Sequence, residues 1–93
     1  MSTILLIGGD RLGNIVNLLQ EMGFQHIYHI TGRKSSQTSI KIPNGVQLIL
    51  VFTDFVNHNL AKRIKSQAKE RQMPILFCKR SCAAIVKALQ QVA

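Results

Sequence analysis

Residues 46–58 read VQLILVFTDFVNH. The first seven are apolar except for Gln47, and a continuous apolar run of this length predicts a buried strand. A helical pattern begins near Val56, directly after Thr53 and Asp54. An acid and a histidine therefore stand where a strand passes into a helix, which is the usual position of functional residues in α/β domains.

The helix predicted after this strand has one apolar stripe, formed by residues four positions apart: Val56, Leu60, Ile64 and Ala68. Cations cover much of its remaining surface, at Lys62, Arg63, Lys65, Lys69 and Arg71. His58 lies in the first turn and off the stripe, so it is interpreted either as a surface or capping residue or as a ligand or acid–base group. Asp54 is interpreted mainly as an N-cap or turn former that holds the start of this helix.

A strand, a turn and a helix are also predicted upstream of the central stretch. Residues 3–7 form a short apolar run that ends at two glycines, and the lack of a basic segment before it favours a first strand over a signal peptide. Asp10 is expected to cap the next helix, whose apolar face lies between residues 12 and 22. Gly23 is a predicted helix stop.

The second predicted strand comprises residues 24–30. His26 and His29 fall on opposite faces of it, because side chains alternate along a strand. Residues 31–45 predict a polar crossover loop without a long helix, and they leave room for a short edge strand at residues 40–42.

The last predicted elements are a strand at residues 74–78, continuously apolar like strands covered on both faces, and a helix at residues 81–92. The element order βαβ–βαβα predicts one α/β domain over residues 1–93. With right-handed crossovers this is a small three-layer fold, in which a parallel sheet has the flavodoxin-like strand order 2-1-3-4 and helices on both faces. The carboxyl ends of all four strands then share one edge, where the loops that follow them converge.

The composition is that of a folded and strongly basic chain. Hydrophobic residues make up 46% and charged residues 17%, and no stretch approaches the ~18 apolar residues that span a membrane. We therefore expect a cytoplasmic protein without membrane insertion. Twelve Lys and Arg stand against four acids, for a formal net charge of +8. This excess favours anionic partners such as nucleic acid, phosphates, carboxylate-bearing cofactors or an acidic protein, although a basic surface without a specific ligand explains it equally well.

Residues 8–11, Gly-Gly-Asp-Arg, could let a phosphate approach a helix N-terminus. They form neither a Gly-x-Gly-x-x-Gly fingerprint nor a Walker loop, and an acid at the start of a helix opposes an anion. Specific nucleotide binding is therefore a minor alternative. A phosphoacceptor site would need clustered acids opposite a lysine, and only Asp10 and Asp54 are available.

Cys78 ends the fourth predicted strand and Cys82 begins the last helix. Both are expected to be reduced, and buried packing is the simplest interpretation of each. Against this interpretation, Lys79, Arg80 and the helix N-terminus should lower a thiol pKa and favour thiolate. Two thiols and one histidine are one ligand short of a structural zinc site, and a Cys–His nucleophile pair would need a third, orienting group. No catalytic set is complete, so no enzymatic activity is predicted.

Three segments resemble one bacterial family: Ile7-Gly8-Gly9-Asp10, the central Phe52-Thr53-Asp54-Phe55-Val56-Asn57-His58, and Met73-Pro74-Ile75-Leu76-Phe77 after a lysine-rich helix. Together they resemble the domain-of-unknown-function family 2325, whose members carry a Gly-Gly-Asp start and a Thr-Asp-x-Val-x-His centre. The resemblance covers essentially the whole chain. It implies a compact α/β fold without an established enzymatic activity, and binding of b-type haem by at least some members.

Carried onto this chain, the resemblance makes His58 one axial ligand of haem iron and Cys78 or Cys82 the other, since histidine and thiolate both ligate haem. Haem propionates would meet cations at the same edge of the sheet, namely Arg11, Arg33, Lys34, Lys79 and Arg80. Apolar side chains would line the macrocycle, namely Phe55, Val56 and Phe77. A domain of this size has little room for haem, so the pocket is expected between the two subunits of a homodimer.

The leading hypothesis is a non-enzymatic haem b protein with a redox-sensing or regulatory role and a regulated protein partner. The alternative is a basic adaptor that binds nucleic acid or an acidic protein through the face from Lys62 to Arg71. Nucleic acid ranks lower as a partner, because that face lacks the aromatic residues that stack on bases and the chain has a single tyrosine, Tyr28. A small thiol- or phosphate-handling enzyme ranks last.

Overall fold

The structure, a computed structural model, describes residues 3–31 and 42–91. Within these residues strands and helices follow in this order: β1 (Thr3–Ile7), α1 (Asn14–Glu21), β2 (His26–Ile30), β3 (Leu48–Phe52), α2 (His58–Glu70), β4 (Ile75–Cys78) and α3 (Cys82–Gln90). All strand pairs are parallel, and the strand order is β2-β1-β3-β4. The predicted α/β fold with the order 2-1-3-4 is confirmed.

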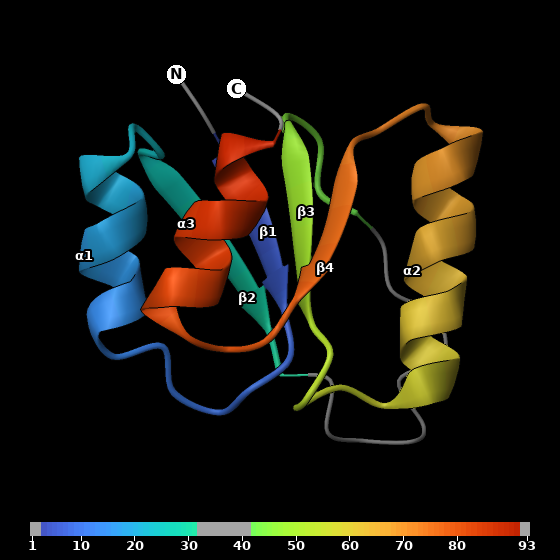
Figure 1. Cartoon of the computed structure of the whole chain (residues 1–93). Helices are drawn as coiled ribbons and strands as arrows, with labels where there is room; N and C mark the ends of the chain where they lie inside the picture. Colours follow the sequence, from blue (N-terminus) through green and yellow to red (C-terminus); the bar gives the residue numbers. More distant parts are fainter. Residues whose placement is uncertain (1–2, 32–41, 92–93) are drawn as a thin grey trace.

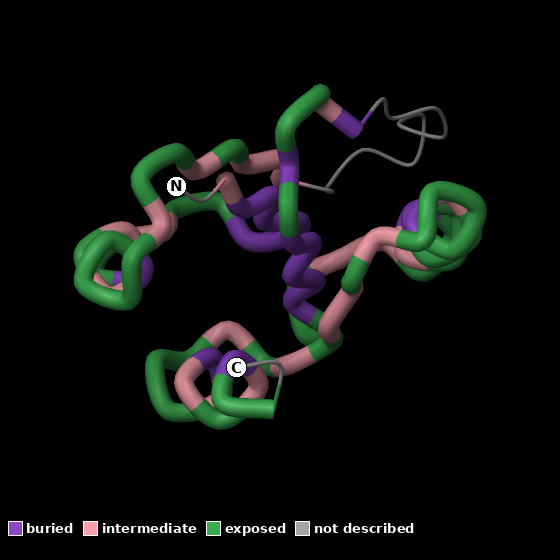
Figure 2. Tube along the Cα trace, turned by 90° about the horizontal axis from the view of Figure 1, so that it is seen from above, coloured by how far each residue is buried: buried purple, intermediate pink, exposed green. Residues whose placement is uncertain are grey.

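Helices cover both faces of this sheet (Figure 1). α1 and α3 pack against one face and α2 packs against the other, so the fold has three layers. Seen from above, the buried chain runs through the sheet at the centre, and each helix turns an exposed surface outward (Figure 2). No helix in the described part of the chain has the length and hydropathy needed to cross a membrane.

The two inner strands, β1 and β3, form the centre of the core. All residues of β3 are buried, which agrees with its continuous apolar sequence. Because successive side chains point to opposite faces, Leu50 and Phe52 pack with α1 and α3, whereas Ile49 and Val51 pack with α2. The central strand predicted from residues 46–52 is thus confirmed.

β4 is an edge strand and is less buried than its apolar sequence suggests. Its residues are half-buried or exposed, and Phe77 keeps 40% of its surface accessible. A strand at the edge has a neighbour on one side only, so the helices cover it incompletely. The expectation of a strand covered on both faces is therefore wrong for β4.

α1 starts later than the sequence predicts. Its first residue is Asn14, and Gly13 occupies the N-cap position without a capping side chain. Asp10 lies four positions before the helix, so its predicted role as the cap of α1 is wrong. The physical reason is the positive φ of Gly8, Gly9 and Gly13, because a right-handed helix cannot use such angles and begins only after the last of them.

α2 also starts later than predicted, at His58. Its N-cap is Asn57, whose Oδ1 accepts a hydrogen bond of 2.9 Å from the amide of Asn59. This bond satisfies one of the free amides in the first turn. Asp54 lies before the helix, in the turn that follows β3, so its interpretation as a turn former is confirmed and its role as the N-cap is wrong.

Part of the predicted crossover lies outside the described residues, which exclude residues 32–41. Arg33, Lys34 and most of the predicted edge strand at residues 40–42 therefore fall there. Ile42 is described: it is 3% exposed, packs into the core layer beneath α2, and belongs to no strand.

Candidate functional site at the carboxyl edge of the sheet

Two loops come into close contact at the carboxyl edge of the sheet, the β1–α1 loop and the β3–α2 loop. The amide of Gly9 donates a hydrogen bond of 3.1 Å to the carbonyl oxygen of Phe55. A Cβ added to Gly8 would lie 2.9 Å from that same oxygen, which is closer than side-chain carbons approach. Gly8 therefore has to be a glycine, both for this contact and for its φ of 112°.

Asp54 joins a third loop, between β4 and α3, to the other two. Its Oδ1 accepts a hydrogen bond of 3.0 Å from the amide of Arg80. Close by, the amide of Thr53 donates to the carbonyl oxygen of Cys78 at 2.9 Å, and the Thr53 hydroxyl donates to it at 3.4 Å. The acid after β3 is thus structural, as interpreted from the sequence, but it connects two loops instead of capping a helix.

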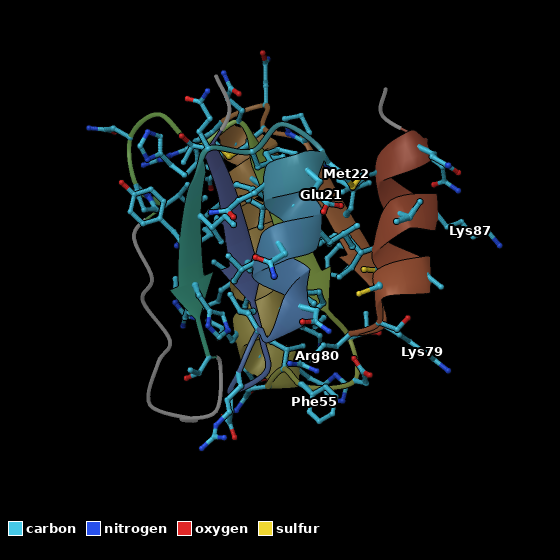
Figure 3. All side chains as sticks on the ribbon, turned by 90° about the vertical axis from the view of Figure 1, so that its left-hand side faces the viewer. Glu21, Met22, Phe55, Lys79, Arg80 and Lys87 are labelled. Atoms are coloured by element: carbon cyan, nitrogen blue, oxygen red, sulfur yellow. The ribbon has the colours of Figure 1, made fainter. Side chains whose placement is uncertain are left out.

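A cavity of about 480 Å³ lies where these loops meet, and we call it the arginine cavity. Its lining residues are Gly9, Asp10, Arg11, Phe55 and Arg80. Phe55 is 54% exposed, and the Arg80 side chain lies beside it (Figure 3). The structure therefore brings together three of the four residues predicted to bind the cofactor.

Lys79, the fourth predicted cofactor-binding residue, lies outside the arginine cavity. Its side chain extends away from Phe55 and Arg80 (Figure 3). It lines a separate hollow beside α3, together with Lys87.

His58 lines a different hollow, on the α2 side of β4. This hollow, which we call the histidine groove, has a volume of about 320 Å³ and is lined by Thr53, Val56, His58, Ala61, Lys62, Lys65 and Phe77. From the sequence, Lys62 and Lys65 belong only to a basic outer face, without a link to His58. The signal was nevertheless present, because residues 58, 61, 62 and 65 have the spacing of neighbours on one helix face.

Neither cysteine lines the histidine groove. Cys78 is half-buried and packs against the core layer of α1 and α3, on the opposite side of the sheet from α2. Cys82 is exposed at the start of α3 and lines a fourth hollow, together with Arg80. The structure does not bring His58 together with either thiol within one chain. Over residues 3–31 and 42–91, no three His, Cys, Asp or Glu side chains are placed to hold a metal ion.

The Cys78 thiol is held in its protonated form. Burial raises its pKa above the ordinary value of 9.0, and the negative charge of Asp54 raises the pKa further. The expectation that Lys79 and Arg80 favour a thiolate is therefore wrong for Cys78. Loss of hydration and a nearby carboxylate outweigh the neighbouring cations.

This raised pKa predicts a loss of stability at alkaline pH. The unfolded chain loses the Cys78 proton near pH 9.0 while the folded chain keeps it, so this contribution is complete below pH 9.0 and declines as the pH rises through the folded-state pKa. Urea unfolding of the wild type and of Cys78→Ala, between about pH 7 and pH 10.5, measures the effect. The stability of the wild type should fall more steeply above pH 9.0, and parallel curves would show that the thiol does not retain its proton.

His29 has a role that the sequence did not reveal. Its Nε2 forms a hydrogen bond of 2.9 Å with the carbonyl oxygen of Gly8. A carbonyl oxygen only accepts, so Nε2 carries the proton and donates. His29 thus connects β2 to the β1–α1 loop at the carboxyl edge of the sheet. His26 is exposed, and the alternation along β2 puts it on the opposite face from His29.

Comparison with known protein families identifies one match. The family DUF2325, described as an uncharacterized protein conserved in bacteria, matches residues 3–92, which is nearly the whole chain. No curated protein and no solved structure matches the chain. On the family match, the chain belongs to the bacterial family DUF2325.

Proposed function

We propose that this protein is a non-enzymatic, b-type haem-binding regulator in which His58 ligates the iron. The observation that carries the proposal is the composition of the histidine groove, which combines an imidazole, apolar side chains and two lysines. Haem requires these three features: an iron ligand, apolar contact with the macrocycle, and cations near the propionates. The donor set of the groove therefore fits haem.

The side chains that line the groove have different proposed roles in binding haem. His58 is the first residue of α2, and the cap by Asn57 holds the turn that carries it. Lys62 and Lys65 lie about one and two turns further along the same helix, and they would hold the propionates. Bound haem would supply a one-electron redox change, which is the signal that a redox-sensing role requires.

A second copy of the chain is proposed to supply a second residue that would hold the haem iron. Each chain has one imidazole in the groove, that of His58, and Cys78 lies on the other side of the sheet with its thiol protonated. Phe77, which lines the groove on an edge strand, is 40% exposed. A symmetric dimer would cover both Phe77 rings and place the haem between two His58 imidazoles, because a two-fold axis pairs identical patches.

Titration with haemin tests the role of His58. The wild type should develop a saturable Soret band, and His58→Ala should weaken binding by more than about 100-fold, because it removes the only imidazole in the groove. His26→Ala is the matched control, since His26 is an exposed histidine on β2, at the opposite edge of the sheet. Absence of a band at stoichiometric haemin contradicts the proposal. So does a band that survives in His58→Ala and disappears in Cys78→Ala or Cys82→Ala.

A second candidate function, a basic adaptor, rests on the outer face of α2. Four exposed cations lie on the helix and a fifth at its C-cap: Lys62, Arg63, Lys65, Lys69 and Arg71. Such a face suits an acidic protein or a phosphate backbone. Binding to duplex DNA driven by phosphate contacts should weaken by about 10³-fold or more between 50 and 200 mM salt. An affinity that does not change with salt excludes that mode.

A further inference from the structure

The arginine cavity has no part in the proposed haem site. Among the described residues, neither a histidine nor a cysteine lines it, and it shares no lining residue with the histidine groove. Its position is nevertheless typical of a ligand site. The adjacent inner strands β1 and β3 lead to helices on opposite faces of the sheet, and the crevice at such a point is where open parallel sheets bind ligands (Figure 1). Its volume of about 480 Å³ also lies within the range of about 300–1,000 Å³ that small-molecule sites have.

We propose that the arginine cavity binds a nucleoside 5′-phosphate, with the base stacked on Phe55 and the phosphate held by Arg11 and Arg80. Phe55 is 54% exposed, whereas Phe52, three positions earlier, is fully buried. An exposed aromatic ring at the wall of a cavity offers a stacking face to a planar base.

The charges of the cavity suit a phosphate. Arg11 and Arg80 both line it, and the planar guanidinium group matches a phosphate through paired hydrogen bonds. Asp10 lines the cavity too, and its single negative charge is outweighed by the two cations.

The residues that would contact the ligand are held in place before it binds. The Arg80 amide is anchored by Asp54, and the Phe55 carbonyl is anchored by Gly9. A Cβ on Gly9 would lie 3.1 Å from both Cδ and Nε of Arg80, so the glycine lets the arginine cross the loop into the cavity. Anchored loops lose little conformational freedom on binding, which favours affinity.

This mode of recognition differs from the phosphate-binding motifs that sequence searches detect. α1 begins only at Asn14, so its free amides are not part of the cavity lining. Recognition relies on arginine and phenylalanine side chains from three separate loops instead. The absence of a glycine fingerprint or a Walker loop is therefore compatible with a nucleotide site here.

Isothermal titration calorimetry of the whole chain with AMP and with UMP tests the proposal. Both should bind saturably with a Kd below about 1 mM. Arg80→Ala and Phe55→Ala should each weaken binding by at least about tenfold, and Arg80→Lys should lose part of the affinity because it keeps the charge without the fork of donors. Lys79→Ala is the matched control: it removes the same charge one position away, from a side chain that points elsewhere (Figure 3). Its affinity should stay within about twofold of the wild type.

Further titrations distinguish binding of a nucleotide from binding of its parts, and the arginine cavity from the proposed haem site. Adenosine and inorganic phosphate should each bind at least about tenfold more weakly than AMP, because each makes half of the contacts. His58→Ala should bind AMP like the wild type, since His58 lines only the histidine groove. The proposal is overturned if neither nucleotide saturates, if phosphate alone binds as tightly as AMP, or if Lys79→Ala costs as much as Arg80→Ala. Thermal unfolding of each variant establishes that it is folded.

Discussion

Gly8→Ala should lower the free energy of unfolding by about 2–6 kcal/mol. Alanine at a φ of 112° is strained by about 1–3 kcal/mol. Its Cβ would also lie 2.9 Å from the Phe55 carbonyl oxygen and 3.2 Å from Cβ of Phe52, and overpacking of this kind costs about 1–3 kcal/mol. Neither neighbour can move easily, because one is backbone and the other belongs to a buried side chain of the central strand.

Gly45→Ala is the matched control for Gly8→Ala. Gly45 has a similar φ of 88°, but a Cβ there would meet no atom of the described residues within 4 Å, so only the backbone strain applies. Urea unfolding of both variants separates the two effects, and in a domain of this size each kcal/mol also corresponds to a change of about 4–8 °C in Tm. Equal losses at the two positions would show that the β1–α1 and β3–α2 loops are not in close contact.

Phe52→Ala should cost about 3–5 kcal/mol, the usual loss when a buried phenylalanine becomes a cavity. Phe52 is fully buried at the end of β3 and packs in the core layer shared with α1 and α3. Its control is Phe55→Ala, in which a ring that is 54% exposed is removed from the same segment. That change should alter stability by no more than about 0.5 kcal/mol. Similar losses for the two variants, measured by urea unfolding, would contradict the placement of the core.

The fold could be predicted because it depends on patterns that are local in the sequence. The apolar run before Phe52 and the stripe of Leu60, Ile64 and Ala68 carry the periodicities of a buried strand and of a one-sided helix. The roles of Asp10 and Asp54 could not be predicted in the same way. An acid directly after a strand resembles a helix cap, but it caps only if the helix begins next to it. Asp10 does not cap α1, because the φ of Gly13 delays the start of that helix. Asp54 instead accepts a hydrogen bond from the Arg80 amide in another loop.

The candidate residues were predicted at the carboxyl edge of the sheet and lie there, but the prediction did not separate them by face. Arg11, Phe55 and Arg80 share one cavity, whereas His58 lines the groove on the α2 side. Topology places loops along an edge, and it does not say into which hollow each side chain points. For Cys78 the face could have been predicted from the alternation along β4. Phe77 lines the groove beside α2, so the next side chain, Cys78, packs against the opposite layer.

Haem is proposed to bind in the histidine groove between two copies of the chain. The stoichiometry of binding tests this arrangement, through titration of a known concentration of protein with haemin while the Soret absorbance is followed. The proposed dimer, with one His58 imidazole from each copy, predicts an endpoint at about one haem per two chains. An endpoint at one haem per chain, or an absorbance that rises without an endpoint, would contradict it.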